Sequence, residues 1–195
     1  MSEPDHSGFA PAHVVPTRRT ARLVLRPPNP GDEEPLARIQ NQPRVLAALT
    51  RADPTSVDQM RATLKQVPVV AAVGVSYSAV IELAVSGTVI GMACLEGVHP
   101  SGAASLNVWV DQDRPERGCG REAAREMIDW GFEELKLTRI LADVVGSNTA
   151  SFDMLTELGF TPIEIRPRDT PTGRQTITTF SLNRPHDQQH GPPIV

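Results

Sequence analysis

The stretch Arg117-Gly118-Cys119-Gly120-Arg121 is the most informative part of this chain for both fold and binding. It follows an apolar segment that ends at Trp109-Val110, and it precedes a run of apolar residues at helical spacing that reaches about Lys136. This pattern predicts a strand that leads into a helix, with the glycines at the turn. Glycine has no Cβ, so the backbone can approach a ligand closely there.

The predicted helix start has the properties of an anion site. The first amides of a helix have no partner inside the helix, and with the positive end of the helix dipole they favour a negative group. Arg117 and Arg121 add charge and can bind a phosphate in bidentate fashion. The spacing excludes both the Gly-Lys-Ser/Thr phosphate loop and the three-glycine dinucleotide loop. From these residues alone, an anion site and an ordinary tight turn are both open.

Hydrophobic periodicity on both sides of the stretch predicts further strands and helices. Strands are expected at residues 21–26, 76–85, 88–98, 105–110, 139–145, 163–166 and 176–182. Helices are expected to begin at Asp32, at Ser56 and at Ser147 or Asn148, in addition to the one after Gly120. Pro43 predicts a break in the first of them, and Gly159 a left-handed end of the last.

Composition predicts a soluble, cytoplasmic protein with one domain. A formal net charge of -4 gives no general attraction to nucleic acid. Cys94 and Cys119 are too few for a disulfide framework, so free thiols in a reducing compartment are expected. No stretch has the length and apolarity of a signal or a membrane span. We expect a disordered segment at residues 1–18, the domain at 19–183 and a flexible tail at 184–195.

Two reactive patterns are interpreted as carrying no chemistry. His186 and His190 have the spacing of helical metal ligands, but they lie in a Pro- and Gln-rich tail without a third ligand. Cys119 at a helix start could be an activated nucleophile, yet no histidine lies near it in sequence. No metal and no covalent intermediate are therefore expected.

The residues around the glycines resemble a known family. Residues 117–123 are similar to the acetyl-CoA loop of the GNAT N-acetyltransferase superfamily, written Gln/Arg-x-x-Gly-x-Gly/Ala. Ser147-Asn148-Thr149-Ala150-Ser151 and Glu157-Leu158-Gly159-Phe160 resemble the Asn-x-x-Ser…Leu-Gly-Phe signature of its RimJ/RimL branch, as do residues 20–27 and 89–91. The resemblance covers about residues 20–182. One departure is Pro115 at the Gln/Arg position, so the backbone amides are expected to hold the pyrophosphate without a leading side chain.

The resemblance implies an α/β fold of the α+β kind, the GNAT fold. Its central, mostly antiparallel mixed sheet is flanked by helices, and strands four and five splay apart to admit the pantetheine arm of the cofactor. Here the splayed strands would be residues 88–98 and 105–110, and Gly91 is compatible with a bulge. The residues expected to contact acetyl-CoA are Trp109, Val110, Arg117, Gly118, Cys119, Gly120, Arg121, Asn148 and Ser151.

The resemblance also implies direct transfer of an acetyl group from acetyl-CoA to a primary amine. Glu96, near the end of a splayed strand, is the first candidate for the base, and its alternative role is that of a solvated carboxylate. His99 is the second candidate. Ser151 is expected to support the leaving thiolate, although capping of a helix by Asn148 and Ser151 would also explain both residues. Tyr77, the one tyrosine, is the single candidate for a tyrosine general acid.

Two classes of function are consistent with these patterns. The first is an N-acetyltransferase whose acceptor is a protein N-terminal α-amine or a small-molecule amine. The second is a catalytically inactive acyl-CoA-binding regulatory module, which Pro115 and the lack of an unmistakable base would explain. A homodimer is possible in either case, because exposed strand edges often pair.

Overall fold

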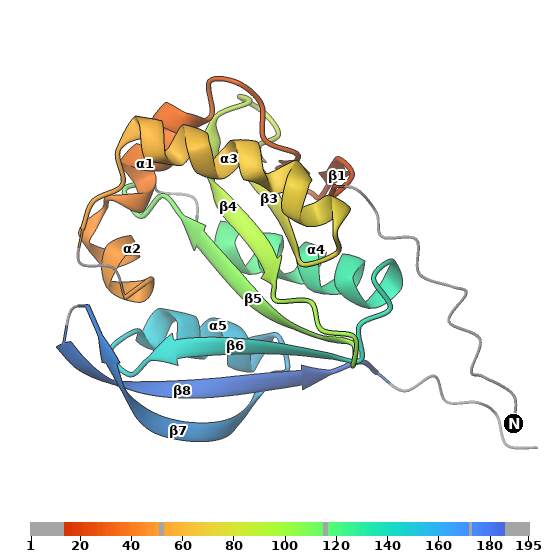
Figure 1. The fold of residues 1–195 in the computed structure, drawn as a ribbon, viewed down its shortest axis with the longest axis vertical. Coiled ribbons are helices and arrows are strands. Elements are labelled where there is room, and N and C mark those ends of the chain that lie inside the picture. Colours follow the sequence, from red (N-terminus) through yellow and green to blue (C-terminus); the bar gives the residue numbers. More distant parts are fainter. Residues whose placement is uncertain (1–13, 51–52, 115–116, 172, 186–195) are drawn as a thin grey trace, which may run out of the picture.

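The computed structural model describes residues 14–50, 53–114, 117–171 and 173–185 (Figure 1). In this part of the chain one sheet has the strand order β1-β2-β3-β4-β5-β6-β8-β7. The strands are β1 (Arg18–Arg19), β2 (Leu23–Arg26), β3 (Ser76–Leu83), β4 (Val89–Glu96), β5 (Ala103–Val110), β6 (Arg139–Val145), β7 (Thr161–Thr170) and β8 (Gly173–Asn183). The helices are α1 (Glu33–Gln40), α2 (Pro43–Ala48), α3 (Val57–Ala72), α4 (Cys119–Glu133) and α5 (Thr149–Glu157).

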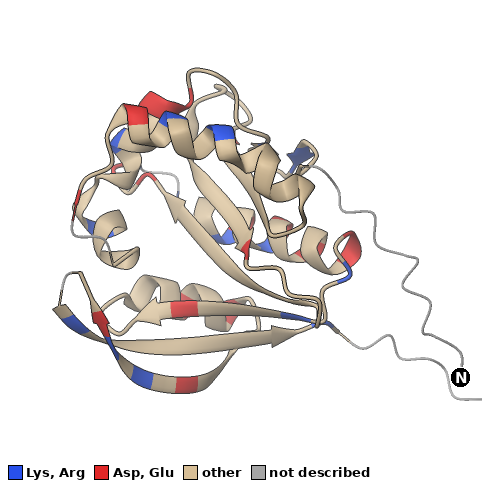
Figure 2. Ribbon diagram, in the orientation of Figure 1, with Lys and Arg blue, Asp and Glu red and all other residues tan. Residues whose placement is uncertain are grey.

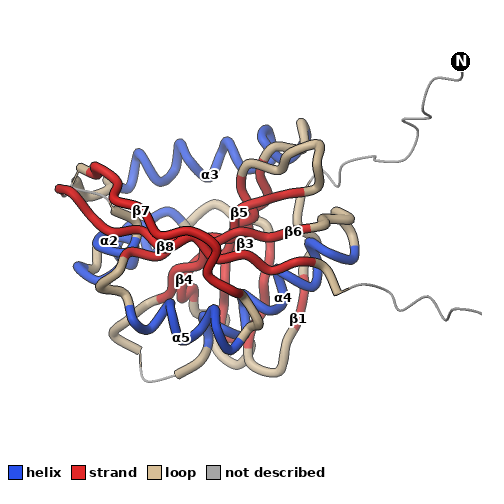
Figure 3. Tube along the Cα trace, turned by 90° about the horizontal axis from the view of Figure 1, so that it is seen from below, coloured by secondary structure: helices blue, strands red, loops and turns tan. Residues whose placement is uncertain are grey.

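The helices cover the two faces of the sheet, with α3 on one side and α4 and α5 on the other (Figure 3). On the α4 side a large apolar core includes Met127, Trp130 and Phe180, all fully buried. On the α3 side a smaller core includes Leu36 of α1 and Leu64 of α3. This three-layer arrangement confirms the mixed, mostly antiparallel α/β fold.

The sheet opens between β5 and β6. β4 and β5 are antiparallel and pair without interruption from Gly91–Val110 to Glu96–Ser105. β5 and β6 are parallel and pair only from Ala103–Arg139 to Ser105–Leu141, after which they diverge (Figure 1). The opening confirms the expected splay, but our placement of it between residues 88–98 and 105–110 is wrong. Those strands form a hairpin with a short loop, whereas α4 separates the parallel pair in sequence.

Gly91 lies at a bulge in β4, as the sequence indicated. Ile81 pairs with Gly91 and Glu82 pairs with Val89, so one residue of β4 is extra. A Cβ at Gly91 would lie 2.1 Å from the carbonyl oxygen of Trp109. The glycine therefore allows β4 to approach the end of β5, the strand that borders the opening.

The helix starts follow the sequence signals with one exception. Ser56 and Gln59 form a reciprocal capping box at the start of α3. The break expected at Pro43 is confirmed: α1 ends at Gln40, and Pro43 begins α2, a position where its missing N–H is harmless. Asp32, the expected cap of α1, makes no side-chain bond to that helix. Its carboxylate instead accepts hydrogen bonds from Arg26, both 2.8 Å long.

The described residues reach slightly beyond the expected N-terminal boundary of the domain. Val15 is fully buried in the large core, and β1 begins at Arg18. Residues 1–13 and 186–195, which include His186 and His190, lie outside the described residues, as does Pro115. Among the helices described, none combines the length and apolarity needed to cross a membrane.

Candidate functional site

Two adjoining cavities lie where β5 and β6 diverge. The larger, of about 750 Å³, is walled by α2, β5, the start of α4 and the turn from β6 to α5. We call it the donor cavity, because most of the residues expected from the family resemblance to contact acetyl-CoA line it. The smaller, of about 260 Å³, extends to Glu96 on β4 and Arg168 on β7 and is called the acceptor cavity. The residues that line both are Ala48, Val108, Trp109, Val145, Asn148, Ser151 and Met154.

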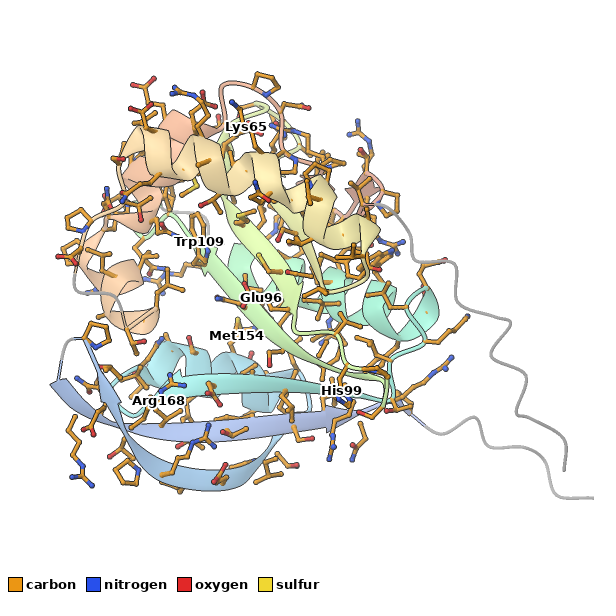
Figure 4. All side chains as sticks on the ribbon, in the orientation of Figure 1. Lys65, Glu96, His99, Trp109, Met154 and Arg168 are labelled. Carbon is orange, nitrogen blue, oxygen red and sulfur yellow. The ribbon has the colours of Figure 1, made fainter. Side chains whose placement is uncertain are left out.

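The shared residues make the two cavities compartments of one cleft. Figure 4 shows Glu96 and Met154 at the opening, with Trp109 toward the end of β5 near α2. β5 carries no charged side chain, and Figure 2 shows the charges beside the opening on other elements. Trp109 and Val110, both expected to contact the cofactor, line the donor cavity. Trp109 is also part of the smaller core, so packing and lining are combined in one side chain.

The two glycines at the start of α4 face the donor cavity. Gly118 is the N-cap of α4 and has a left-handed backbone, with φ of 84°, which favours glycine. Gly120 follows within the first turn, where an added Cβ would lie 3.6 Å from Val110. A side chain at position 120 would therefore extend toward Val110 and Met154 of the donor cavity, whereas a Cβ at Gly118 would lie 3.4 Å from Nη2 of Arg22. The amides and the open space above them fit a pyrophosphate group.

Arg22 of the segment before β2 supports this helix start from behind. Its Nη1 donates to the carbonyl oxygen of Arg117 at 2.8 Å, and its Nε donates to Glu122 at 2.7 Å. Glu122 also accepts from the Thr20 hydroxyl at 2.5 Å. Burial alone would raise the pKa of Glu122, but these hydrogen bonds outweigh it and lower the pKa. The charge of the carboxylate is thus balanced by Arg22, so that Glu122 opposes an anion at the helix start less strongly.

The other predicted loop residues have different positions. Arg121 lines the donor cavity and forms an ion pair of 2.6 Å with Glu157 of α5, both being about half exposed. Arg117 is exposed and does not contribute to the wall of either cavity. The side chain of Cys119 is buried in the large core, so only its backbone can face a ligand. Of the two arginines, Arg121 alone lines the donor cavity in the described chain, and the contact of either with the cofactor stays a prediction.

Asn148 and Ser151 stand where the two cavities meet. Asn148 is the N-cap of α5, and its side-chain oxygen accepts the N–H of Ser151 at 3.2 Å. Capping of α5 is therefore confirmed for Asn148. The Ser151 hydroxyl has no hydrogen-bond partner among the described residues. Met154, three residues further along the same face of the helix, completes this wall.

Glu96, the last residue of β4, lines the acceptor cavity. The residue keeps contact with solvent, but its carboxyl end is surrounded closely enough that desolvation raises its pKa. Within the described chain it forms no ion pair. A carboxylate in such surroundings holds a proton more readily than one in water, which suits a base that accepts a proton from an amine.

The two other candidates for proton transfer lie elsewhere. His99 is on the exposed loop after β4, bonded through Nδ1 to the Ser101 hydroxyl at 2.8 Å, and it lines neither cavity. Figure 4 shows it at the end where β5 and β6 converge. Tyr77 is fully buried and packs edge-on against Trp130, with ring centroids 5.2 Å apart. Among the described residues, neither His99 nor Tyr77 lines the cavities that meet at Ser151.

Several lining residues carry no signal in the sequence. Arg44 projects from α2 into the wall of the donor cavity, while Asp143 and Arg168 line the acceptor cavity. Met154 could have been found, because it lies one turn after Ser151. The others come from elements that are distant in the sequence and become neighbours only when the sheet forms.

Asp111, just after β5, holds α1 and α2 in place beside the donor cavity. Its carboxylate accepts from Gln42 at 2.7 Å and from Arg38 at 3.1 Å. Burial opposes the charge of this group, but the hydrogen bonds from Gln42 and Arg38 prevail and lower its pKa. The α2 wall of the cleft is therefore fastened to the end of the splayed strand.

Comparison with known proteins identifies the family. The model of the acetyltransferase (GNAT) domain family matches residues 22–161 of this chain. The chain belongs to the GNAT acetyltransferase family. A curated relative, the uncharacterized N-acetyltransferase p20 of Bacillus licheniformis, is 28% identical over 145 residues, which are 74% of this chain and 82% of the relative. As a GNAT protein the chain is an acyltransferase, and acetyl-CoA is its donor substrate.

Solved structures of other GNAT proteins share this fold. A spermidine N-acetyltransferase from Vibrio cholerae in complex with CoA and spermine superposes with a TM-score of 0.74 at 18% identity, covering 84% of this chain and 96% of that one. RimJ from Mycobacterium smegmatis in complex with CoA-disulfide gives 0.73 at 22% identity, covering 83% and 81%. At these levels of identity the likeness shows the shared fold and does not define the acceptor of this chain.

Proposed function

We propose that this protein is an N-acetyltransferase that moves the acetyl group of acetyl-CoA directly to a primary amine in the acceptor cavity. The observation that carries the proposal is the junction of the two cavities. Ser151 and Asn148 line both compartments, and Glu96 lines the acceptor compartment alone. A donor in one and an amine in the other would meet beside Ser151, with a carboxylate on the amine side.

The donor would be held mainly by the backbone. The pyrophosphate fits the amides at the start of α4, between Gly118 and Arg121, and the pantetheine arm fits the unpaired edge of β5 up to Val110. Asn148 can offer its amide group to that arm while its oxygen caps α5. This arrangement brings the thioester end of the donor toward Ser151.

Glu96 is proposed as the base. Glu96 first accepts a proton from the acceptor ammonium, directly or through water, and the neutral amine then attacks the thioester carbonyl. As the carbon–sulfur bond breaks, the nitrogen loses its second proton and the CoA thiolate takes up a proton, which gives the amide and free CoA. The Ser151 hydroxyl then donates a hydrogen bond to the departing sulfur. The remaining rate acceleration comes from holding the two reactants close together in the correct orientation.

An amine of modest basicity suits this site. Removing the proton from a lysine with pKa of about 10.4 costs roughly 4.6 kcal/mol at pH 7, whereas an α-amine near 8 costs about 1.4 kcal/mol. A single carboxylate is a weak base and suits an amine that loses its proton at low cost. We therefore propose an α-amine as the acceptor group, on a protein N-terminus or on a small molecule.

The test is the release of free CoA from acetyl-CoA in the presence of a panel of amines, with mass spectrometry of the products. The proposal predicts acetylation of α-amines, and a loss of about a hundred-fold in kcat/KM at pH 7 for Glu96→Gln, with unchanged affinity for acetyl-CoA. Glu134→Gln, an exposed carboxylate at the end of α4, is the matched control and should keep full activity. Tight binding of acetyl-CoA without turnover of any amine would overturn the proposal.

A further inference from the structure

The acceptor cavity contains charged groups of both signs. Within the described chain its ionic lining residues are Glu96, Asp143 and Arg168. Glu96 comes from β4, on one side of the opening. Asp143 of β6 and Arg168 of β7 come from the other side. An acceptor in this cavity is therefore placed between a carboxylate on one strand and an arginine on another.

The carboxylate of Asp143 already accepts hydrogen bonds from neighbouring side chains. Its Oδ1 accepts the Thr179 hydroxyl at 2.7 Å, and its Oδ2 lies 3.0 Å from Nη1 of Arg168 and 3.6 Å from Nη2 of Arg166. Arg166 in turn pairs with Glu164. With these donors around it, Asp143 has little capacity left for the ammonium group of a ligand.

Arg168, in contrast, has donors to spare. Arginine carries five N–H groups in a planar fork, and the described contacts of Arg168 use only Nη1, toward Asp143. The side chain is about 41% exposed, so the remaining N–H groups are reachable from the cavity. Asp143 holds the guanidinium in place, and the free part of the fork matches a carboxylate.

We infer that Arg168 determines acceptor specificity by binding a carboxylate that the acceptor carries near its reactive amine. This inference rests on the proposed function, with the amine at Glu96. The acceptor class is then an amine with a nearby carboxylate, either a free amino acid or the acidic N-terminal residue of a peptide. A polyamine is disfavoured because its second ammonium would meet Arg168 rather than an unpaired carboxylate.

The experiment compares matched acceptors that differ only in this charge. Free alanine is compared with alaninamide, a peptide with N-terminal Asp with the same peptide with N-terminal Asn, and both pairs with spermidine. Each kcat/KM is calculated for the unprotonated amine, because loss of the carboxylate also lowers the pKa of the α-amine. For the wild-type protein the acidic member of at least one pair should have a kcat/KM about ten-fold higher, which is the factor expected for one charge-assisted hydrogen bond. The pair that shows it identifies the source as a free amino acid or a peptide.

The variants separate recognition from folding. In Arg168→Gln the ratio of kcat/KM for the acidic acceptor to kcat/KM for the neutral acceptor should fall to about one, while the rate with the neutral acceptor stays within about two-fold of the wild type. Arg168→Glu should favour spermidine over the acidic acceptors. Arg174→Gln, an exposed arginine on β8 outside both cavities, is the control and should keep the wild-type preference. Thermal unfolding of each variant monitors the fold.

Two outcomes would overturn the inference. Equal rates for acidic and neutral acceptors, or an equal loss for both in Arg168→Gln, would remove Arg168 from acceptor recognition while leaving the acetyltransferase proposal intact. No turnover of any acceptor would overturn the proposed function and this inference with it.

Discussion

The donor and acceptor cavities meet at Ser151, but they are built in different ways. In the donor cavity, which α2, β5, the start of α4 and the turn into α5 enclose, the proposed pyrophosphate site is made of backbone at the glycines that start α4. The acceptor cavity is formed by single side chains from distant strands, with Glu96 on β4, Asp143 on β6 and Arg168 on β7. A site made of backbone amides is independent of side-chain identity and suits a constant donor. Side chains can be replaced, so a site made of them can differ in the acceptor that it binds.

The largest effect is expected where the proposed pyrophosphate site is filled. In Gly120→Trp the indole would enter the donor cavity beside Val110 and Met154. We expect the affinity for acetyl-CoA to fall more than about a hundred-fold, because the volume of the pyrophosphate site is lost. Isothermal titration calorimetry with acetyl-CoA measures this.

Gly120→Ala is the matched control for that variant. Its Cβ would make only ordinary van der Waals contact, at 3.6 Å from the nearest atom of Val110. Affinity within about three-fold of the wild type is expected. If Gly120→Trp still bound acetyl-CoA normally, the assignment of the donor cavity would be wrong.

A smaller effect is expected at the junction of the two cavities. Ser151→Ala removes the hydroxyl proposed to stabilise the departing sulfur, and it leaves the backbone N–H that Asn148 caps. The expected result is a kcat about ten-fold lower at unchanged KM for acetyl-CoA, as for the loss of one hydrogen bond to a charged group. Steady-state kinetics with saturating acceptor measure it. A variant with full kcat would remove Ser151 from the chemistry.

The smallest effect is expected behind the donor cavity. Arg22→Gln removes the hydrogen bond to the Arg117 carbonyl and exposes the charge of Glu122 to the pyrophosphate site. We expect KM for acetyl-CoA to rise about three- to five-fold with little change in kcat, since an exposed ion pair contributes about 0.2–1 kcal/mol. The double variant Arg22→Gln/Glu122→Gln should recover part of the loss. If the double variant is instead weaker than the single one, electrostatic neutralisation by Arg22 is excluded.

The same contrast explains what could be predicted from the sequence. Strands and helices with clear periodicity, such as β6 and α3, were predicted because local hydrophobic patterns and caps define them. The glycine turn that starts α4 was predicted because Gly118 and Gly120 lie two residues apart in one short stretch, and the binding of the cofactor by their backbone stays a prediction. The family resemblance then named the ligand, which an anion site alone did not.

The acceptor side escaped prediction for a physical reason. Asp143 and Arg168 come together only through the pairing of β6, β8 and β7, and nothing in their local sequence records that pairing. The position of the splay was missed for a similar reason, since it depends on how far two parallel strands stay paired. Glu96 was predicted as the base, and the structure places it in the acceptor cavity, but its catalytic role is still a prediction.

The pH dependence of kcat/KM for wild type and Glu96→Gln tests the central proposal most directly. Desolvation raises the pKa of Glu96, and as a base the residue must be ionised. With an α-amine acceptor, whose pKa is about 8, the wild-type value should be constant between the two pKa values. It should fall below the pKa of Glu96, at a pH higher than for an unperturbed carboxylate.

Glu96→Gln has no base and must use the unprotonated fraction of the amine. Its kcat/KM should therefore fall about ten-fold for every pH unit below the pKa of the acceptor, so the two proteins differ most in acid. Identical pH profiles for the two proteins would contradict the account and show that the proton leaves by another route.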